Sequence, residues 1–175
     1  MPARRVIETP LCPMTAAATD RGVCLLEFGA PDRLTREQTD LEGLLGEPFR
    51  DENHPLLDRL DEELRAYFAG RLSSFTVPLD TPGTDWQRRV WDALLRIPFG
   101  RTTTYGRLAE KLGNPGGSRA VGLANGQNRV AILIPCHRVI ASDGTLHGYA
   151  GGLDRKRALL DHEALHAGAN LFTTT

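Results

Sequence analysis

The stretch Thr81-Pro82-Gly83-Thr84 divides the chain into two halves of different character, and this division limits the folds open to the sequence. Before it lie short strand-like runs separated by turn residues, followed by one amphipathic helix. After it the sequence has the pattern of several short helices. A length of 175 residues suits one domain or two small ones. We therefore predict two domains, residues 1–80 and residues 81–175.

The first half has the pattern of a small α/β domain. Pro10, Pro13 and Gly22 separate its first runs of β-forming residues, as turns separate strands. Leucines and aromatic residues fall on one face of its longest helical stretch, which Gly70 closes. The expected strands cover residues 4–8, 14–19, 23–28 and 74–79, and the expected helices cover residues 36–45 and 55–69.

The second half predicts four helices with recognisable N-cap residues. The N-cap candidates are Thr84 or Asp85 for the first helix, Thr103 or Thr104 for the second and Ser118 for the third. The expected helices cover residues 85–95, 105–112, 118–125 and 153–163. A glycine-containing turn at residues 114–117 joins the two middle helices, which is the outline of a helix-turn-helix. Many helix pairs share this outline, so it does not by itself establish DNA binding.

Charge is divided unevenly between the two halves. Residues 1–80 carry 9 Lys and Arg against 15 Asp and Glu, a net of −6, whereas residues 81–175 carry 12 against 7, a net of +5. The second half is therefore the one suited to a polyanion. No apolar run approaches the roughly 18 residues of a membrane span or the roughly 7–15 of a secretory signal. We expect a cytoplasmic protein with no membrane partner.

Cys136 has the surroundings of a nucleophile. The apolar run at residues 131–134 leads to it, Pro135 restricts the backbone before it, and His137 follows. A thiol with a pKa near ~8.5 needs a base beside it at neutral pH. Adjacent residues of an extended segment point to opposite sides, so contact with His137 requires a turn or a bridging water. Glu163 is the best placed carboxylate to orient that histidine.

The alternative for Cys136 is a buried small hydrophobic residue, the usual fate of a single cysteine. Cys12 and Cys24 lie in the strand-like region without nearby histidines, and core packing is the better interpretation of both. There is no CxxC motif. His162 and His166 have i, i+4 spacing, which is more often a solvated helix face than a zinc site. We predict no metal and no cofactor.

The segment Ile134-Pro-Cys-His-Arg-Val139 resembles the active-site signature of the O6-alkylguanine-DNA alkyltransferases (methylated-DNA–protein-cysteine methyltransferases) of the bacterial type. The chain start and the tryptophan-containing stretch at residues 86–100 are similar to the family as well. The resemblance covers almost the whole chain. Further motifs follow in the family's order and spacing, namely Tyr105-Gly-Arg-Leu-Ala109, residues 113–122, Asn125 to Asn128, and Tyr149-Ala-Gly-Gly-Leu153.

The resemblance implies an α+β fold, in which an α/β domain with a small antiparallel sheet precedes a helical domain with a winged helix-turn-helix. It implies direct-reversal DNA repair, in which the alkyl group moves irreversibly from guanine oxygen to Cys136. By resemblance His137 takes the thiol proton through a water, Glu163 orients His137, Asn128 braces the turn and Tyr105 hydrogen-bonds the base. An alkyl thioether has no route to release, so each molecule acts once.

The same resemblance implies that the alkylated nucleotide is flipped out of duplex DNA. Arg119, on the second helix of the helix-turn-helix, would fill the vacated space. The implied DNA-binding residues are Arg119, Ser118, Ala120, Gly122, Asn114 and Ser142. The implied base pocket comprises backbone groups of Cys136 and Val139, together with Tyr149 and Ala150. The only partner expected is double-stranded DNA containing O6-alkylguanine, bound by a monomer, with cooperative binding left open.

Two positions depart from the family's pattern. Arg129 stands where many members carry proline, and Ala131 replaces another proline of some members. The turn is then less rigid, or Arg129 adds a phosphate contact, and the sequence does not decide between these. One alternative function is a sensor that binds alkylguanine without repairing it, but such relatives carry tryptophan in place of the acceptor cysteine. A Cys-His-Glu hydrolase is a further alternative, in which Arg119 has no role.

Overall fold

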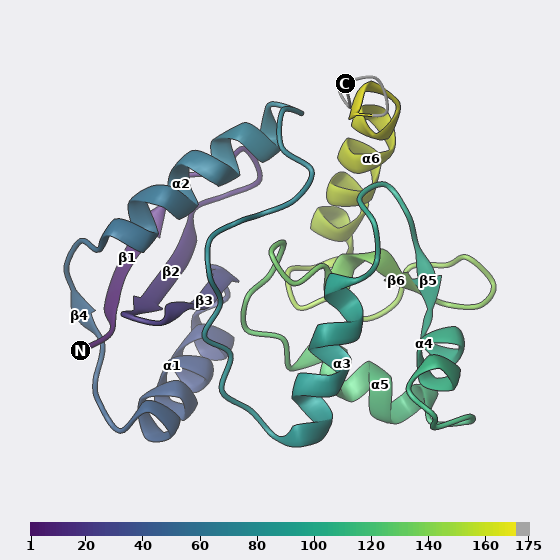
Figure 1. Cartoon of the computed structure of the whole chain (residues 1–175), viewed down its shortest axis with the longest axis horizontal. Coiled ribbons are helices and arrows are strands. Elements are labelled where there is room, and N and C mark those ends of the chain that lie inside the picture. The colour runs from purple at the N-terminus through teal and green to yellow at the C-terminus, as the bar shows by residue number, and fades with distance from the viewer. Residues whose placement is uncertain (171–175) are drawn as a thin grey trace. The chain divides into compact units, whose positions relative to one another are not determined.

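The computed structural model describes residues 1–170, which divide into two compact units (Figure 1). The N-terminal unit comprises Met1–Pro82 together with Arg129–Ala131. The C-terminal unit comprises Gly83–Asn128 and the residues from Ile132 onward. The predicted α+β class is confirmed, because the first unit contains a small sheet with two helices and the second is mainly helical.

The N-terminal unit contains a four-stranded sheet in the order β3-β2-β1-β4. The strands are β1 (Ala3–Ile7), β2 (Met14–Thr19), β3 (Gly22–Phe28) and β4 (Arg50–Asp51). The first three pair antiparallel, and the two-residue β4 pairs parallel with β1. Cys24 is an extra residue in the pairing of β2 with β3, since Ala17 pairs with Leu25 and Ala18 with Val23. This bulge increases the local twist of the sheet.

Two helices cover this sheet, with α2 above it and α1 below it in Figure 1. Helix α1 (Pro31–Leu45) packs Leu41 against Ala17 and Leu25 of the sheet. The helix begins five residues before the predicted start at residue 36, because Pro31 suits the first helical turn. Helix α2 (Pro55–Phe68) buries the apolar face that the sequence predicts, namely Leu57, Leu60, Leu64 and Tyr67.

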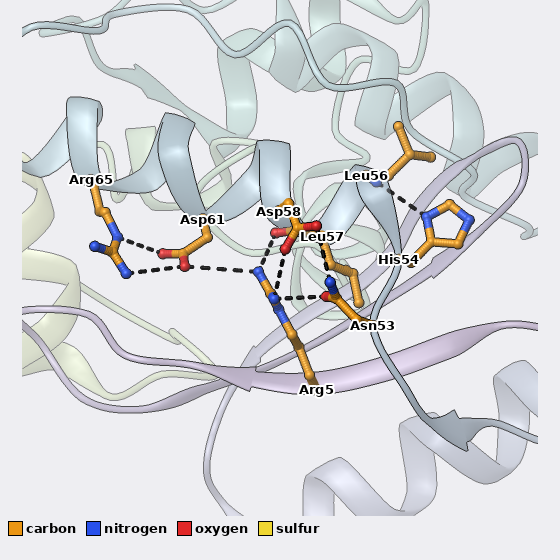
Figure 2. A network of polar contacts seen from close by, with 8 residues as sticks. All are labelled: Arg5, Asn53, His54, Leu56, Leu57, Asp58, Asp61 and Arg65. Carbon is orange, nitrogen blue, oxygen red and sulfur yellow. Dashed lines mark hydrogen bonds and ion pairs between the residues drawn. The ribbon is translucent and has the colours of Figure 1, made fainter.

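Arg5 of β1 fastens the start of α2 to the sheet (Figure 2). Its guanidinium donates to the Asn53 side chain at 2.8 Å, to Asp58 at 2.9 Å and to the Leu57 carbonyl at 2.8 Å. His54 caps the helix by accepting a hydrogen bond from the Leu56 amide. The acidic first turn of α2 thus meets an arginine as well as the positive end of the helix dipole.

Two segments from outside the sheet cover the outer edge of β3. Val23 exchanges backbone hydrogen bonds with Pro78 and Asp80, at 2.8 and 2.9 Å. The predicted strand at residues 74–79 is wrong, because only Leu79 forms an isolated bridge, and the adjacent Pro78 has no N–H to extend a ladder. Further along β3, Leu26 pairs with residues 129–131 through an isolated parallel bridge to Val130.

The C-terminal unit is a set of short helices around a two-stranded parallel pair, β5 (Thr103–Thr104) and β6 (Val139–Ile140). Thr84 and Gln87 form a capping box at the start of α3 (Asp85–Leu95), and Thr104 caps α4 (Tyr105–Lys111). The remaining elements are α5 (Ser118–Gly126), the 3-10 turn η1 (Cys136–Arg138) and α6 (Leu153–Asn170).

Two sequence expectations for this unit are corrected. Ser118 is the first residue of α5 and not its N-cap, because Gly117 occupies the cap position without a side-chain hydrogen bond. Helix α6 continues well beyond the predicted end at residue 163. Within residues 1–170, no helix is both long enough and apolar enough to cross a membrane.

Candidate active site

Cys136 opens the 3-10 turn η1, directly after Pro135, and its side chain is almost completely buried. The Asn128 side-chain amide nitrogen donates to the Cys136 sulfur at 3.1 Å and to the Ile134 carbonyl at 2.9 Å. One carboxamide therefore holds both the nucleophile candidate and the backbone two residues before it. An N–H group directed at sulfur stabilises the thiolate form.

The chain between Asn128 and Cys136 contains one strained residue. Ile132 has a φ of +71°, and it is the one non-glycine residue among those described with a positive φ. A β-branched residue in this region costs about 1–3 kcal/mol and persists only where its surroundings hold it. Ile132 is buried, as are its neighbours Ala131 and Leu133. The turn that presents Cys136 is thus held in place by its packing and hydrogen bonds.

His137 lies beside Glu163 of α6, with 2.7 Å between its Nε2 and Glu163 Oε1. Both side chains are completely buried. Arg138 donates to the same carboxylate twice, from Nε at 2.8 Å and from Nη2 at 2.9 Å. The amide of Gly100 adds a fourth hydrogen bond at 3.1 Å. Glu163 is therefore hydrogen-bonded at both oxygens by three residues.

The hydrogen-bond partners of Glu163 determine whether its carboxylate is charged. Burial opposes ionisation of Glu163, but the hydrogen bonds from His137 and Arg138 and the charge of Arg138 outweigh it and hold the pKa of Glu163 well below its ordinary value. Glu163 is an anion at neutral pH, so the Nε2 of His137 must carry a hydrogen toward it. A buried arginine and a buried carboxylate paired in this way require each other.

His137 is suited to act as a base. Burial, which outweighs the opposing effect of Glu163, lowers the pKa of His137 and favours the neutral ring. With Nε2 bonded to Glu163, Nδ1 is the nitrogen that can accept a proton. This Nδ1 is buried and has no hydrogen-bond partner among the described residues. The arrangement leaves one basic nitrogen available next to the cysteine in the sequence.

Tyr105, the first residue of α4, has its pKa raised by burial and secondarily by Cys136. Its hydroxyl donates to the His147 carbonyl at 3.4 Å. Lys156 of α6 is also completely buried, and its ammonium donates to the carbonyls of Val139 at 2.6 Å and His147 at 3.1 Å. Burial lowers the pKa of Lys156, and Cys136 acts in the opposite direction. Cys136 thus acts on the pKa values of two proton donors, Tyr105 and Lys156.

The predicted helix-turn-helix corresponds to α4 and α5. An open hollow of about 390 Å³ lies between them, and its lining includes the predicted residues Tyr105, Ser118, Arg119, Gly122 and Ser142. Arg119 is exposed, and within the described part of the chain its guanidinium makes no hydrogen bond or ion pair. A free guanidinium at the rim of a hollow is available to a ligand.

Two tryptophans of α3 hold α5 in place. Trp86 donates from its ring nitrogen to the Ala120 carbonyl at 3.2 Å, and Trp91 donates to the Ala124 carbonyl at 2.9 Å. Their acceptors are one helical turn apart on α5. The α3 helix therefore fixes the axial position of α5 as well as packing against it.

The other predicted site residues lie outside the hollow's lining. Ala120 is half-buried and supplies the acceptor for Trp86. Asn114 packs its amide against Gly117, where any Cβ would overlap it. The Val139 carbonyl accepts from Lys156, and its amide donates to the Cys136 carbonyl. Tyr149 is half-buried and Ala150 is exposed. The structure thus brings only some of the predicted residues together at one surface.

The remaining cysteines and histidines offer no second centre. Burial raises the pKa of Cys24 to about 12, with a further contribution from Asp80, so its thiol stays protonated. The rings of His162 and His166 lie 4.4 Å apart. In the part of the chain that the structure describes, no group of three or more His, Cys, Asp and Glu side chains could hold a metal ion.

Comparison with known proteins identifies the family. Residues 3–81 match the ribonuclease-like domain of 6-O-methylguanine DNA methyltransferase, and residues 85–165 match the DNA binding domain of the same protein. The methylated-DNA–protein-cysteine methyltransferase of Methanosarcina barkeri is 43% identical over 158 residues, covering 90% of this chain and 94% of that protein. The chain belongs to this methyltransferase family. The predicted resemblance is confirmed.

Solved structures of the methyltransferase family share the fold. Mycobacterium tuberculosis O6-methylguanine methyltransferase has a TM-score of 0.79 and 42% identity, covering 98% of both chains. The structure of Mycobacterium tuberculosis OGT in complex with DNA has a TM-score of 0.80 and 43% identity, covering 97% of both chains. The methyltransferase of Mycobacterium bovis is 58% identical over 110 residues, which cover 63% of this chain and 67% of that protein.

Three residues of this methyltransferase site lay outside the sequence prediction. Arg138, part of the motif around Cys136, forms an ion pair with Glu163. Lys156 stands seven residues before Glu163 and so on the same face of α6. Asn125 is buried and donates to the Cys136 carbonyl at 3.5 Å. The i, i+7 spacing could have identified Lys156.

Proposed function

We propose that the protein is a methylated-DNA–[protein]-cysteine S-methyltransferase that repairs DNA by direct reversal. It binds double-stranded DNA, flips O6-alkylguanine out of the helix and transfers the alkyl group to Cys136. The observation that carries this proposal is the buried Cys136 with Asn128 on its sulfur and the His137–Glu163 pair beside it in the chain. The names of its relatives and the DNA complex of one of them support the same reaction.

The reaction begins with removal of the thiol proton. His137 accepts it at Nδ1 through a bridging water, while Glu163 holds the hydrogen on Nε2 and stabilises the resulting imidazolium. The Asn128 amide stabilises the thiolate that forms. Because Glu163 remains ionised, no proton needs to move to the carboxylate.

The thiolate then displaces guanine from the alkyl carbon. A carbon–sulfur bond forms as the carbon–oxygen bond breaks, and the electron pair of that bond passes to the guanine. Tyr105 donates a hydrogen bond or proton to the departing base, and the proton on His137 restores the balance. The raised pKa of Tyr105 keeps its hydroxyl protonated for this role.

The helix-turn-helix delivers the base. Arg119 enters the space that the flipped nucleotide leaves, and its exposed guanidinium, unpaired among residues 1–170, supports that role. Ser118, Ala120 and Gly122 of α5, with Asn114 and Ser142, approach the DNA backbone. Backbone groups of Cys136 and Val139, together with Tyr149 and Ala150, complete the pocket for the base.

The product sets the stoichiometry. A thioether has no carbonyl for water to attack and no good leaving group, so each molecule acts once. We also propose that a monomer acts in the cytoplasm, that residues 81–175 contain the DNA-binding and acceptor functions, and that residues 1–80 serve mainly as a scaffold. O6-alkylguanine is the proposed specific lesion.

Intact-protein mass spectrometry tests the proposal. The protein is incubated with an excess of duplex DNA containing O6-methylguanine, beside a Cys136→Ala variant. We expect one added methyl group per molecule in the wild type and none in the variant. Binding without any mass change would instead indicate a sensor of alkylguanine. Many turnovers on an ester substrate would indicate a Cys-His-Glu hydrolase.

A further inference from the structure

Part of the chain segment that leads to Cys136 belongs to the N-terminal unit. Its residues Arg129–Ala131 belong to that unit, whereas Asn128 and Ile132 on either side belong to the other. The Leu26 amide donates to the Arg129 carbonyl at 2.9 Å, and the Ala131 amide donates to the Leu26 carbonyl at 2.8 Å. These two backbone bonds add the segment to the edge of β3 and fix its position along the strand.

The Arg129 side chain extends this attachment. Its guanidinium donates to the Pro82 carbonyl at 3.2 Å, at the end of the N-terminal unit. Its charge also acts on the buried Glu37 of α1, whose pKa is raised to about 8 by burial and by the neighbouring Glu27, with Arg33 and Arg129 opposing. Arg129 is half-buried. The guanidinium is thus committed to groups within the N-terminal unit.

The residues on either side of residues 129–131 help to hold Cys136 in place. The residue before Arg129 is Asn128, whose amide reaches the Cys136 sulfur at 3.1 Å. The residue after Ala131 is the strained Ile132, at a φ of +71°. A strained backbone relaxes when the contacts that hold it are lost. Loosening residues 129–131 would therefore shift the carboxamide and the cysteine relative to each other.

We propose that Arg129 is a positioning residue for Cys136: by fastening residues 129–131 to the N-terminal unit, it keeps the Asn128 amide on the sulfur. The proposal rests on the proposed function, because alkyl transfer is its main readout. It assigns the N-terminal unit a part in the chemistry, through the backbone that the two units share. It also gives Arg129 a role other than a phosphate contact.

The test compares wild-type protein with Arg129→Ala, Arg129→Lys and the control Arg36→Ala. Arg36 lies exposed on α1 and donates to the Asp32 carbonyl of the same helix. Single-turnover rates are measured with free O6-benzylguanine and with a duplex containing O6-methylguanine. Affinity for undamaged duplex is measured at several salt concentrations. Circular dichroism and thermal unfolding restrict the comparison to folded protein.

We expect Arg129→Ala to slow transfer about tenfold or more from both substrates, because small displacements near reacting atoms have effects of this size. Affinity for undamaged duplex and its salt dependence should match the wild type. Arg129→Lys should recover most of the rate, since an ammonium can still donate to the Pro82 carbonyl. Arg36→Ala should behave as wild type.

Two results would overturn the proposal. In the first, Arg129→Ala reacts normally with the free base but binds duplex more weakly, with a salt slope smaller by about 0.9, as loss of one phosphate contact would produce. In the second, Arg129→Ala matches the wild type with both substrates. If wild-type protein transfers no alkyl group, the proposed function fails separately. The rate of Cys136 modification by iodoacetamide then replaces transfer, and an unchanged rate in Arg129→Ala would refute the positioning role.

Discussion

The carboxylate of Glu163 lies 2.7 Å from Nε2 of His137, and neither side chain is exposed to solvent. The carboxylate is anionic because Arg138 and the Gly100 amide also hydrogen-bond to it. The histidine is therefore held with one nitrogen occupied and the other basic. This relationship determines which nitrogen can receive a proton during alkyl transfer.

Glu163→Gln should slow alkyl transfer by about 10- to 1000-fold, because an amide does not stabilise the imidazolium as a carboxylate does. It also leaves the buried Arg138 without its counter-charge, so stability should fall. Single-turnover rates on protein shown to be folded give the measurement. Glu62→Gln, an exposed position on α2, serves as the control. An unchanged rate in folded Glu163→Gln would mean that Glu163 is only structural.

The rate of transfer should fall at acidic pH with a midpoint below the ordinary histidine value of about 6.5. Burial lowers the pKa of His137, so the ring stays neutral and basic to lower pH than an exposed histidine would. The rate is then full above this lowered pKa and is lost as the pH falls through it. Rates from pH 4.5 to 8 with free O6-benzylguanine avoid effects on DNA binding. A midpoint at or above 6.5 would contradict the assignment of His137 as the base.

Arg119→Ala should slow repair of duplex DNA about 10- to 100-fold while leaving the reaction with free O6-benzylguanine nearly unchanged. The reason is that the unstacking of a flipped base costs a few kcal/mol, which the arginine offsets only in a duplex. The ratio of the two single-turnover rates is the quantity to report. Equal losses on both substrates would remove the base-flipping role.

Gly100→Ala should destabilise the protein by about 1–3 kcal/mol. Gly100 has a φ of +71°, and an added Cβ would lie 2.5 Å from the Ala167 Cβ of α6. Gly144→Ala is the matched control, because Gly144 has a φ of +80° with nothing within 4 Å of an added Cβ. Urea unfolding of both variants separates the backbone strain they share from the overlap at Ala167. Equal decreases in the free energy of unfolding for the two variants would show that the overlap with Ala167 does not destabilise the protein.

Local signals in the sequence were enough to predict much of the helical half. Thr84 or Asp85 is the expected N-cap of the helix at residues 85–95, and the structure confirms this helix with Thr84 as its cap and adds a capping box with Gln87. For Glu163, expected as the carboxylate that orients His137, the structure has Oε1 2.7 Å from the Nε2 of that histidine. The capping box lies within one helix, whereas the contact between His137 and Glu163 joins residues 26 positions apart.

Other contacts between distant residues have no local signal in the sequence. Arg129 donates to the carbonyl of Pro82, 47 residues earlier, and no local pattern indicates that partner. The β-forming residues before Leu79 predicted a strand, but the ladder needs a continuous row of donors that Pro78 interrupts. Arg138 stands in the motif around Cys136, but no local pattern indicates that its partner is Glu163 on a later helix.

Residues 78–80 and 129–131 both hydrogen-bond to the outer edge of β3. A fragment that contained the first half alone would therefore lose part of this pairing. On the outer edge of β3, Val23 is paired by residues just before the linker, whereas Leu26 is paired by residues 129–131, about a hundred positions later in the chain. A fragment ending near residue 82 would keep the first cover and lose the second. Its exposed strand edge would be free to pair with another copy, so proteolytic cleavage of this chain after the linker would create an aggregation-prone fragment.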